Sequence, residues 1–422
     1  MTESAGRPGL TRRALLGRGL ATGATGLVAG GAAGAVLGRS TAAEASASDA
    51  AFTAGQQRVP FHGIHQAGIV DPPPAAAIFA AFDVISPDRA QFTRMCRTIT
   101  ERARFLTTGG APAAVSGEQP QDDSGILGPV VPPDALTVTV SFGASLFDER
   151  YGLAEHKPTG LGPMPVFGND RLVAGETHGD LLVQLCANQP DTCLHALRDL
   201  ARHTRGDLAL RWKIDGFNAP SREAPGATGR NLLGFKDGTA NPVREDPGAA
   251  GALVWAGAGE PAWAVGGSYQ VVRIIRMLVE FWDRVSLKEQ ENMIGRRRAS
   301  GAPLDGTHEF DAPRYEADAD GLVIPHDAHI RRSNPRTTET AESRILRRGF
   351  SYSRGFDAAG HLDMGLAFCC YQRDVHRQFE AVQIRLDGEP LEDYVKPTGG
   401  GYFFALPGVR DAADWYASAL LA

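Results

Sequence analysis

Three short segments of the sequence hold side chains that could act together on a bound group. The first, residues 231–242, reads Asn-Leu-Leu-Gly-Phe-Lys-Asp-Gly-Thr-Ala-Asn-Pro, and two glycines flank its single carboxylate, Asp237. Glycine lets a backbone turn tightly and approach a ligand closely, so this carboxylate would be held at a fixed position. The alternative is an ordinary turn in which Asp237 bonds only its own backbone. The segment matches neither glycine-rich nucleotide motif, which excludes a phosphate loop of either type here.

The second segment, residues 327–336, places one histidine before a cluster of arginines. His329 is followed by Arg331, Arg332 and Arg336, and the segment closes with Asn-Pro-Arg. A neutral imidazole beside concentrated positive charge suits an axial haem ligand with arginines that pair the propionate carboxylates. Of the three arginines, Arg332 is the one we expect to bind a propionate. The alternative is an exposed basic loop.

The third segment, residues 344–352, contains the adjacent arginines Arg347 and Arg348 within an apolar stretch. Neighbouring side chains of a strand point to opposite faces, so one of the two must point inward unless the strand is an edge. A buried arginine requires an anionic partner, or can itself stabilise an oxyanion. The alternative is a structural ion pair.

The elements that must position these segments are short strands and helices. β-branched and aromatic residues predict strands at residues 78–85, 136–142, 180–186, 208–217, 269–277, 346–352 and 362–371. Helices are expected at residues 88–107, 192–204, 285–295, 372–386 and 411–421. This mixture favours an α+β fold over a regular βαβ repeat. A loop rich in Pro, Gly and Ser at residues 219–230 predicts two domains, residues 52–220 and 230–422.

The first 43 residues differ from the rest and predict a twin-arginine signal peptide. Arg12 and Arg13 precede a charge-free run of mostly Ala and Gly, residues 19–38, and small residues near position 43 offer A-x-A cleavage sites. The run is too weakly apolar for a good membrane span; the alternative is an uncleaved anchor. Because this route exports folded proteins, it suggests a cofactor inserted before export. We therefore expect a periplasmic, extracytoplasmic or secreted protein with no membrane span in its mature chain.

The net charge and the cysteine content argue against a nucleic-acid-binding protein and against a disulfide-rich scaffold. The chain carries a formal charge of −6, and because residues 1–43 hold five Arg and one Glu, the remainder carries about −10. Such an acidic protein is a poor binder of nucleic acid or anionic membranes. The five cysteines are few and odd in number, and the adjacent Cys369 and Cys370 cannot easily pair within a strand. We expect all five cysteines to be free and to pack as small buried hydrophobic residues. The alternative is a disulfide bridge between Cys186 and Cys193.

Together the three segments resemble the dye-decolorizing peroxidases, a family of haem peroxidases. The family hallmark G-x-x-D-G stands at residues 234–238, and its longer form here is typical of the exported bacterial branch. Residues 329–336 resemble the proximal haem segment, residues 345–352 the distal arginine strand, and residues 61–69 the opening segment. The resemblance implies two ferredoxin-like domains, each an antiparallel sheet flanked by helices, with haem held mainly by the second.

The resemblance also implies roles for single residues. His329 would bind the iron of one haem b per chain, and Asp237 would take a proton from hydrogen peroxide and return it to the leaving oxygen. Arg347 would stabilise the developing negative charge. Because a carboxylate base stays ionised at acidic pH, we expect an acidic optimum.

Four further residues are expected beside the cofactor. The resemblance places Lys236, Gly238 and Thr239 there with the hallmark motif. A histidine ligand usually donates its other N–H to a carboxylate, and Asp374, just after the last apolar strand, is the expected acceptor. The alternative for Asp374 is a helix N-terminal residue favoured by the helix dipole.

These expectations lead to three functional hypotheses. The first is an enzyme that reduces hydrogen peroxide and oxidises a small phenolic or dye-like reductant. The second is a periplasmic deferrochelatase that releases iron from haem, with partners in an iron-uptake system. The third is a haem carrier without chemistry, which the presence of both Asp237 and Arg347 argues against. The resemblance also makes a homodimer the expected state.

Overall fold

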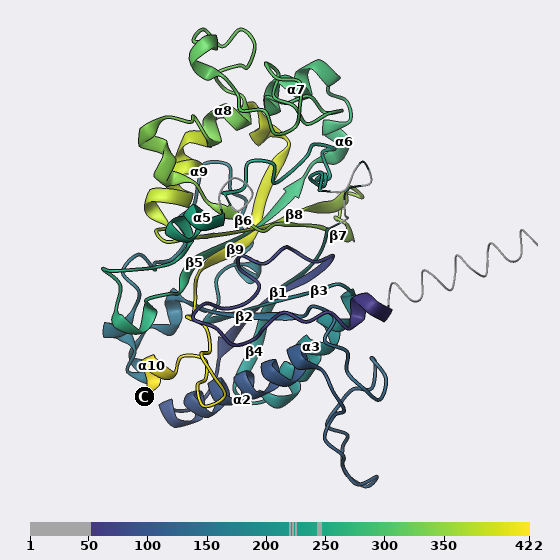
Figure 1. Cartoon of the computed structure of the whole chain (residues 1–422), viewed down its shortest axis with the longest axis vertical. Coiled ribbons are helices and arrows are strands. Elements are labelled where there is room, and N and C mark those ends of the chain that lie inside the picture. Colours follow the sequence, from purple (N-terminus) through teal and green to yellow (C-terminus); the bar gives the residue numbers. More distant parts are fainter. Residues whose placement is uncertain (1–51, 219–220, 222, 224–225, 243–246) are drawn as a thin grey trace, which may run out of the picture. The chain divides into compact units, whose positions relative to one another are not determined.

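Two β-α-β-β-α-β units, one in each half of the chain, build the fold of this computed structural model (Figure 1). The structure describes residues 52–218, 221, 223, 226–242 and 247–422, so the predicted signal peptide lies outside the described residues. The first unit contains β1 (Ala76–Val84), α2 (Arg89–Thr108), β2 (Thr137–Gly143), β3 (Leu181–Ala187), α3 (Pro190–His203) and β4 (Leu208–Phe217). Residues 54–422 form one compact unit.

The second unit follows α5 (Pro247–Val254) and has a broken middle strand. It contains β5 (Ser268–Met277), α6 (Val279–Trp282), α7 (Leu287–Ile294), α8 (His329–Ser333), β6 (Leu346–Arg347), β7 (Phe350–Phe356), β8 (Leu362–Gln372), α9 (Ala381–Leu386) and β9 (Val395–Ala405). A short α10 (Ser418–Leu421) ends the chain.

The strands of both units join into one closed antiparallel barrel. The first unit has the strand order β4-β1-β3-β2 and the second the matching order β7-β8-β5-β9, which is ferredoxin-like in each case. The units meet at both edges, because β2 pairs with β9 and β4 pairs with β7. The predicted α+β class with two ferredoxin-like units is therefore confirmed. The boundaries at residues 52–220 and 230–422 stay a prediction.

Alternation along the strands separates two faces of the sheet. The inner face packs into a cluster that we call the barrel core, which includes Phe79, Leu182, Val272, Phe350 and Tyr371. Helices α2 and α3 cover the outer face of the first unit, and α7, α8 and α9 lie on the opposite side of the strands (Figure 1). A residue next to a barrel-core residue in β5 or β8 therefore faces these last helices.

Helix α2 shows how the sequence sets these elements. Asp88 accepts a hydrogen bond from the Gln91 backbone at 2.7 Å, which caps the helix. Its apolar residues recur every three or four positions, so one face is buried; the buried apolar members are Phe92, Met95, Cys96, Ile99, Ala103 and Leu106. The prediction of a helix at residues 88–107 is confirmed.

Other predicted elements differ from the structure. The strand expected at residues 346–352 is interrupted between β6 and β7. The helix expected at residues 372–386 begins only at His376, with a π-helical turn, because β8 continues to Gln372. Only the last turn of the helix expected at 411–421 forms, as α10. All five cysteines are free and buried, so the prediction of small buried hydrophobic residues is confirmed and the Cys186–Cys193 bridge is wrong.

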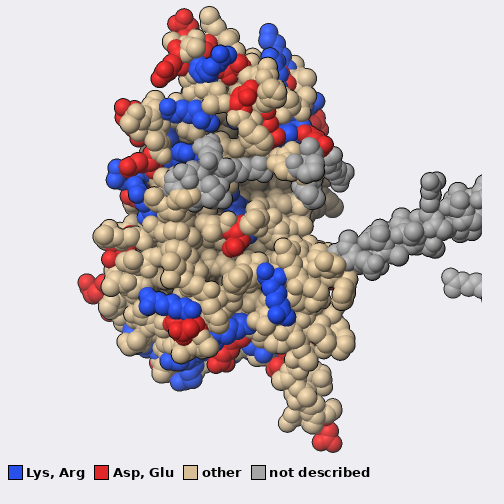
Figure 2. Space-filling view, viewed as in Figure 1, with Lys and Arg blue, Asp and Glu red and all other residues tan. Residues whose placement is uncertain are grey.

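The surface carries charges of both signs. On the face drawn in Figure 2, lysine and arginine side chains are interspersed with aspartate and glutamate. Within the described ranges, no helix combines the length and the apolar character needed to cross a membrane.

Candidate active site

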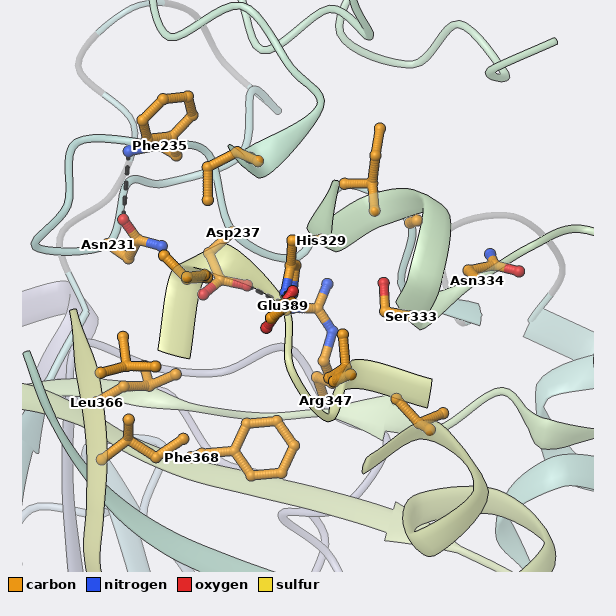
Figure 3. Close-up of a pocket in the computed structure, with 18 of the residues that line it drawn as sticks. Asn231, Phe235, Asp237, His329, Ser333, Asn334, Arg347, Leu366, Phe368 and Glu389 are labelled. Atoms are coloured by element: carbon orange, nitrogen blue, oxygen red, sulfur yellow. Dashed lines mark hydrogen bonds and ion pairs between the residues drawn. The ribbon is translucent and has the colours of Figure 1, made fainter. Parts of the chain in front are cut away.

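A cavity of about 280 Å³ lies between the second unit's sheet and its helices. Strand β5 contributes Ile275 and Met277, and β8 contributes Leu366 and Phe368 (Figure 3). These residues alternate with the barrel-core residues Ile274, Ala367 and Cys369, which point to the other face. Apolar side chains from α9 complete much of the wall. The cavity is thus mainly apolar with a few polar groups, as is usual for a cofactor site.

His329, the first residue of α8, lines this cavity and is held by a buried carboxylate. Its Nδ1 lies 3.0 Å from Oε1 and 2.9 Å from Oε2 of Glu389. Burial alone would lower the pKa of His329, but the Glu389 carboxylate raises it above the ordinary histidine value. Donation of the Nδ1 proton to Glu389 directs the lone pair of Nε2 away from this pair, which suits a metal ligand.

The expected partner of His329, Asp374, was wrong. The Asp374 carboxylate accepts hydrogen bonds of 3.0 Å from the backbone N–H groups of His376 and Arg377. It therefore caps the helical turn that starts at His376, which was the alternative interpretation, and it does not line the cavity. Glu389 takes the role instead from a turn 60 residues after His329 along the chain.

Asp237 and Arg347 form an ion pair on the cavity wall. Nη1 of Arg347 donates to Oδ1 of Asp237 at 2.5 Å, and both side chains are about two-thirds buried (Figure 3). Gly234 and Gly238, on either side of Asp237, have φ values of +85° and +109°, which strongly favour glycine. The hallmark motif therefore works as a tight turn that presents its carboxylate to the cavity.

Asn241 fixes the other member of this pair. Its Nδ2 donates to the Arg347 carbonyl at 2.7 Å, and its Oδ1 accepts from the Arg347 backbone N–H at 3.1 Å. The side-chain amide thus pairs with Arg347 as a neighbouring strand would. One turn holds both the carboxylate and, through Asn241, the backbone of its cationic partner.

The remaining motif residues line the cavity with their polar ends engaged elsewhere. Nζ of Lys236 donates to Oε2 of Glu309 at 2.6 Å and pairs with Glu223 at 2.9 Å. The hydroxyl of Thr239 also donates to Glu309, at 3.3 Å. Lys236 and Thr239 therefore brace the turn through Glu309.

Arg296 and Arg336, and not the expected Arg332, lie on the cavity wall with Tyr315. We call these three residues the cationic corner. Arg332 does not line the cavity, because its Nη1 donates to the Asp387 carbonyl at 2.8 Å. Arg296, Arg336 and Tyr315 do line it. Burial raises the pKa of Tyr315 to about 12, although the guanidinium groups of Arg336 and Arg296 lower it. These two arginines and the phenol therefore lie close together.

This corner fits the carboxylates of a haem. The Tyr315 hydroxyl is buried and has no hydrogen-bond partner in the described part of the chain. Burial lowers the pKa of the Arg296 guanidinium, whose Nη1 donates only to the carbonyls of Gly301 and Glu309. A propionate would accept from both residues and neutralise a buried cation. Together with the apolar walls and His329, the residues present fit the group that the sequence predicts.

Sequence reasoning missed several residues of this site. Glu389 lies in the turn Asp387-Gly388-Glu389-Pro390, and no local pattern relates it to His329. Tyr315 begins a short 3-10 helix and Arg296 follows the end of α7, and no motif marks either residue. Asn241 lies within the segment of residues 231–242. Its position just after the Asp237 turn was the one sequence feature that could have indicated a role in the site.

Known proteins resemble this chain over nearly its whole length. Residues 66–218 match the family described as Dyp-type peroxidase, N-terminal, and residues 228–410 match Dyp-type peroxidase, C-terminal. A deferrochelatase from Yersinia pestis is 53% identical over 416 residues, which cover 97% of this chain and 94% of that protein.

Two solved structures show the same architecture. A DyP-type peroxidase from Cellulomonas bogoriensis has a TM-score of 0.78 and 39% identity, covering 87% of this chain and 99% of its own. An oxyferrous complex of DtpA from Streptomyces lividans has a TM-score of 0.79 and 37% identity, covering 88% and 99%. Both matches extend over most of this chain and nearly all of the other. The chain therefore belongs to the DyP-type peroxidase family of haem-dependent oxidoreductases.

Proposed function

We propose that this chain holds one haem b in the cavity and reduces hydrogen peroxide at the expense of a small phenolic or dye-like reductant. The observation that carries the proposal is the Asp237–Arg347 pair on the wall of a cavity that also presents His329. The bound haem supplies the electron-transfer chemistry. The residues described above bind it, hold the peroxide and move its proton.

Asp237 and Arg347 divide the work at the peroxide. Oδ1 of Asp237 is held by Arg347, so Oδ2 is the oxygen that takes a proton from hydrogen peroxide and returns it to the departing oxygen. The Arg347 guanidinium lies beside the same place and stabilises the negative charge that develops there.

The haem would be held by residues from several elements. His329 would bind the haem iron, and Glu389 would orient its ring and increase its electron donation. Arg296, Arg336 and Tyr315 bind the propionates in place of Arg332. Gly238 leaves room for close approach at the turn, since a Cβ there would meet no atom nearer than 3.7 Å.

Mixing haem-loaded protein with hydrogen peroxide in a stopped-flow spectrometer tests this proposal. A rapid shift of the Soret band, followed by its return when a phenolic reductant is added, is the expected result. His329→Ala should lose tight haem binding, which separates the ligand role from the chemistry. An unchanged Soret band in fully loaded protein would exclude the peroxidase.

A second candidate function is haem iron release. It is favoured by the Yersinia pestis relative, a deferrochelatase at 53% identity. Incubation with haem and a reductant, followed by chromatography of the tetrapyrrole, distinguishes the two functions. Recovery of metal-free porphyrin with released iron would support this activity and a partner in iron uptake.

The leader and the oligomeric state also belong to this proposal. Arg12 and Arg13 direct the folded, haem-loaded protein through the twin-arginine route, so replacing both with Lys should leave it in the cytoplasm. We infer a homodimer from the family resemblance alone. Light scattering of the purified holoprotein measures the oligomeric state directly.

A further inference from the structure

Arg348 points away from the cavity and into the barrel core. It stands between Leu346 and Phe350, which both belong to that core, and it is only 4% exposed. Its backbone N–H donates to the Cys369 carbonyl at 2.7 Å, and its Nη1 donates to the Asp71 carbonyl. Of the two adjacent arginines, Arg347 faces the cavity and Arg348 is the one enclosed by the sheet.

The buried guanidinium of Arg348 lacks a counter-charge among the described residues. Its Nε and Nη2 are buried without a hydrogen-bond partner, and no described carboxylate forms an ion pair with it. The carboxylate of Asp71, whose carbonyl it contacts, is turned to the Gly68 backbone N–H at 2.7 Å. An isolated buried charge is strongly unfavourable, so a compensating group is required.

A second unpartnered donor lies close to this charge. The hydroxyl of Thr137, a residue only 2% exposed, has no hydrogen-bond partner within the described ranges. Thr137 pairs with Cys186 across β2 and β3. Gly68 connects the two side chains. A Cβ on Gly68 would lie 2.7 Å from the Thr137 hydroxyl oxygen, and the Gly68 N–H donates to Asp71, whose carbonyl accepts from Arg348. The two unpartnered groups therefore converge on one point of the barrel core.

Gln184, a buried side-chain acceptor between the sheets, is already in use. Oε1 of Gln184 accepts from the Tyr371 hydroxyl at 2.7 Å and from Nε2 of Gln270 at 2.9 Å. The groups that remain around Arg348, the Thr137 hydroxyl and the Cys186 thiol, can both donate, and neither carries a charge that would balance the guanidinium. A water molecule there would need acceptors for its own hydrogens and would leave the charge unbalanced. An anion needs only donors and neutralises the guanidinium.

We propose that Arg348 and Thr137 bind a small monovalent anion of chloride size inside the barrel core. The S–H group of Cys186 is placed to donate to the same ion. Arg348 belongs to the second unit, whereas Thr137 and Cys186 belong to the first. The anion therefore links the two units where their sheets face each other, away from the haem cavity, which Arg348 does not line.

Crystals of the haem-loaded protein grown in sodium bromide test this site directly. Diffraction at the bromine absorption edge should give one anomalous peak within hydrogen-bond distance of Arg348 Nε or Nη2 and of Thr137 Oγ1. Density of water strength at that point without anomalous signal would overturn the proposal. So would bromide peaks confined to the surface.

Thermal unfolding gives a second readout that does not depend on crystals. At constant ionic strength, replacing gluconate with chloride over a hundredfold range should raise the unfolding midpoint by about 3–5 °C. Thr137→Val should weaken this dependence and Arg348→Met should abolish it. Thr107→Val is the matched control, because Thr107 is equally buried but donates to the Ala103 carbonyl in α2. A midpoint in wild-type protein that ignores chloride would contradict the site even if Arg348→Met fails to fold.

Discussion

At the scale of single residues, two carboxylates serve one cavity by different means. Asp237 is held by a glycine turn and paired with a cation, and about a quarter of its surface stays exposed, so it can exchange a proton. Glu389 is 6% exposed and paired with His329, so its charge acts on the histidine rather than on solvent. The same side-chain chemistry is thereby divided between proton transfer and tuning of a ligand.

Arg347→Leu should reduce the rate of reaction with peroxide more than Asp237→Ala does. The guanidinium stabilises charge throughout the step, whereas water can partly replace a proton acceptor. We expect losses of about 100- to 1,000-fold for Arg347→Leu. Stopped-flow rates with protein of equal haem content measure both. Equal rates, or the opposite order, would reject this assignment.

Glu389→Gln should raise the reduction potential of the haem iron. A neutral amide no longer increases the electron donation of His329, so the ferric state loses stabilisation. Spectroelectrochemistry of the holoprotein measures the potential. Asp374→Asn is the control: it also removes one carboxylate charge, but Asn caps a helical turn about as well as Asp, so stability and potential should both stay close to wild type.

The sequence predicts the site residues that lie in a distinctive local motif. It does not predict those that reach the site only through the tertiary fold. His329, Asp237 and Arg347 line one cavity, as expected from three motifs whose local patterns are distinctive. Glu389 could not be chosen, because its relation to His329 arises only when the turn after α9 folds onto α8. Asp374 was wrong and Arg332 does not line the cavity, because neither a place at a strand end nor a place within a motif sets the direction of a side chain.

At the scale of elements, a side chain can substitute for a strand. Asn241 offers Arg347 both a donor and an acceptor at 2.7 and 3.1 Å, as an adjacent β-strand would. Arg347 is the last residue of β6 and pairs with Cys370 of β8, and the amide of Asn241 adds a second pairing to it. The hydrogen bonds of Asn241 therefore hold the hallmark turn and the arginine strand together.

Asn241→Ala should lower both stability and the rate with peroxide. Loss of the amide leaves two backbone groups of Arg347 without their partner, at a cost of about 1–3 kcal/mol. Denaturant unfolding and stopped-flow rates report the two effects. Asn218→Ala is the matched control, since Asn218 donates to the Gly349 carbonyl at 3.3 Å and does not line the cavity. A rate loss of equal size in both variants would argue against a positioning role for Asn241.

Strand β9 was the one long strand that the sequence did not predict. Its first half contains Pro397 and three consecutive glycines, a composition that ordinarily argues against a strand. The structure supplies the reason for these residues. A Cβ on Gly400 would lie 1.9 Å from the Val272 carbonyl oxygen, so neighbouring backbones approach too closely for any side chain.

Gly400→Ala should therefore destabilise the fold markedly. The residue has φ +109° as well as the steric conflict, and overpacking alone costs about 1–3 kcal/mol. Chemical denaturation measures the free energy of unfolding. Gly162→Ala, whose Cβ would meet no atom within 4 Å, should stay within about 0.5 kcal/mol of wild type. Similar values for the two variants would show that β9 can shift to make room.

At the scale of the whole molecule, the two units share one core. The barrel core contains residues of β1, β3 and β4 together with residues of β5, β7, β8 and β9. Separating the units would expose this surface and break the pairings of β2 with β9 and β4 with β7. We therefore expect the two repeats of one topology to behave as one structural domain.

The described chain from residue 54 should unfold in a single thermal transition, and a fragment of residues 230–422 should not fold alone. The exposed inner face of its sheet would favour aggregation. Calorimetry of the full chain and circular dichroism of the fragment test this. Two separate transitions, or a folded fragment, would instead support the independent domains that the loop at residues 219–230 suggests.

The alternation of side chains along β8 limits how the length of the chain can be changed. Leu366 and Phe368 face the cavity, while Ala367, Cys369 and Tyr371 face the barrel core. Inserting or deleting one residue before this run would exchange the two sets at once. The strand can therefore accept substitutions one at a time but not a change in length. Insertions for engineering belong in long surface segments such as residues 109–133, which leave this alternation intact.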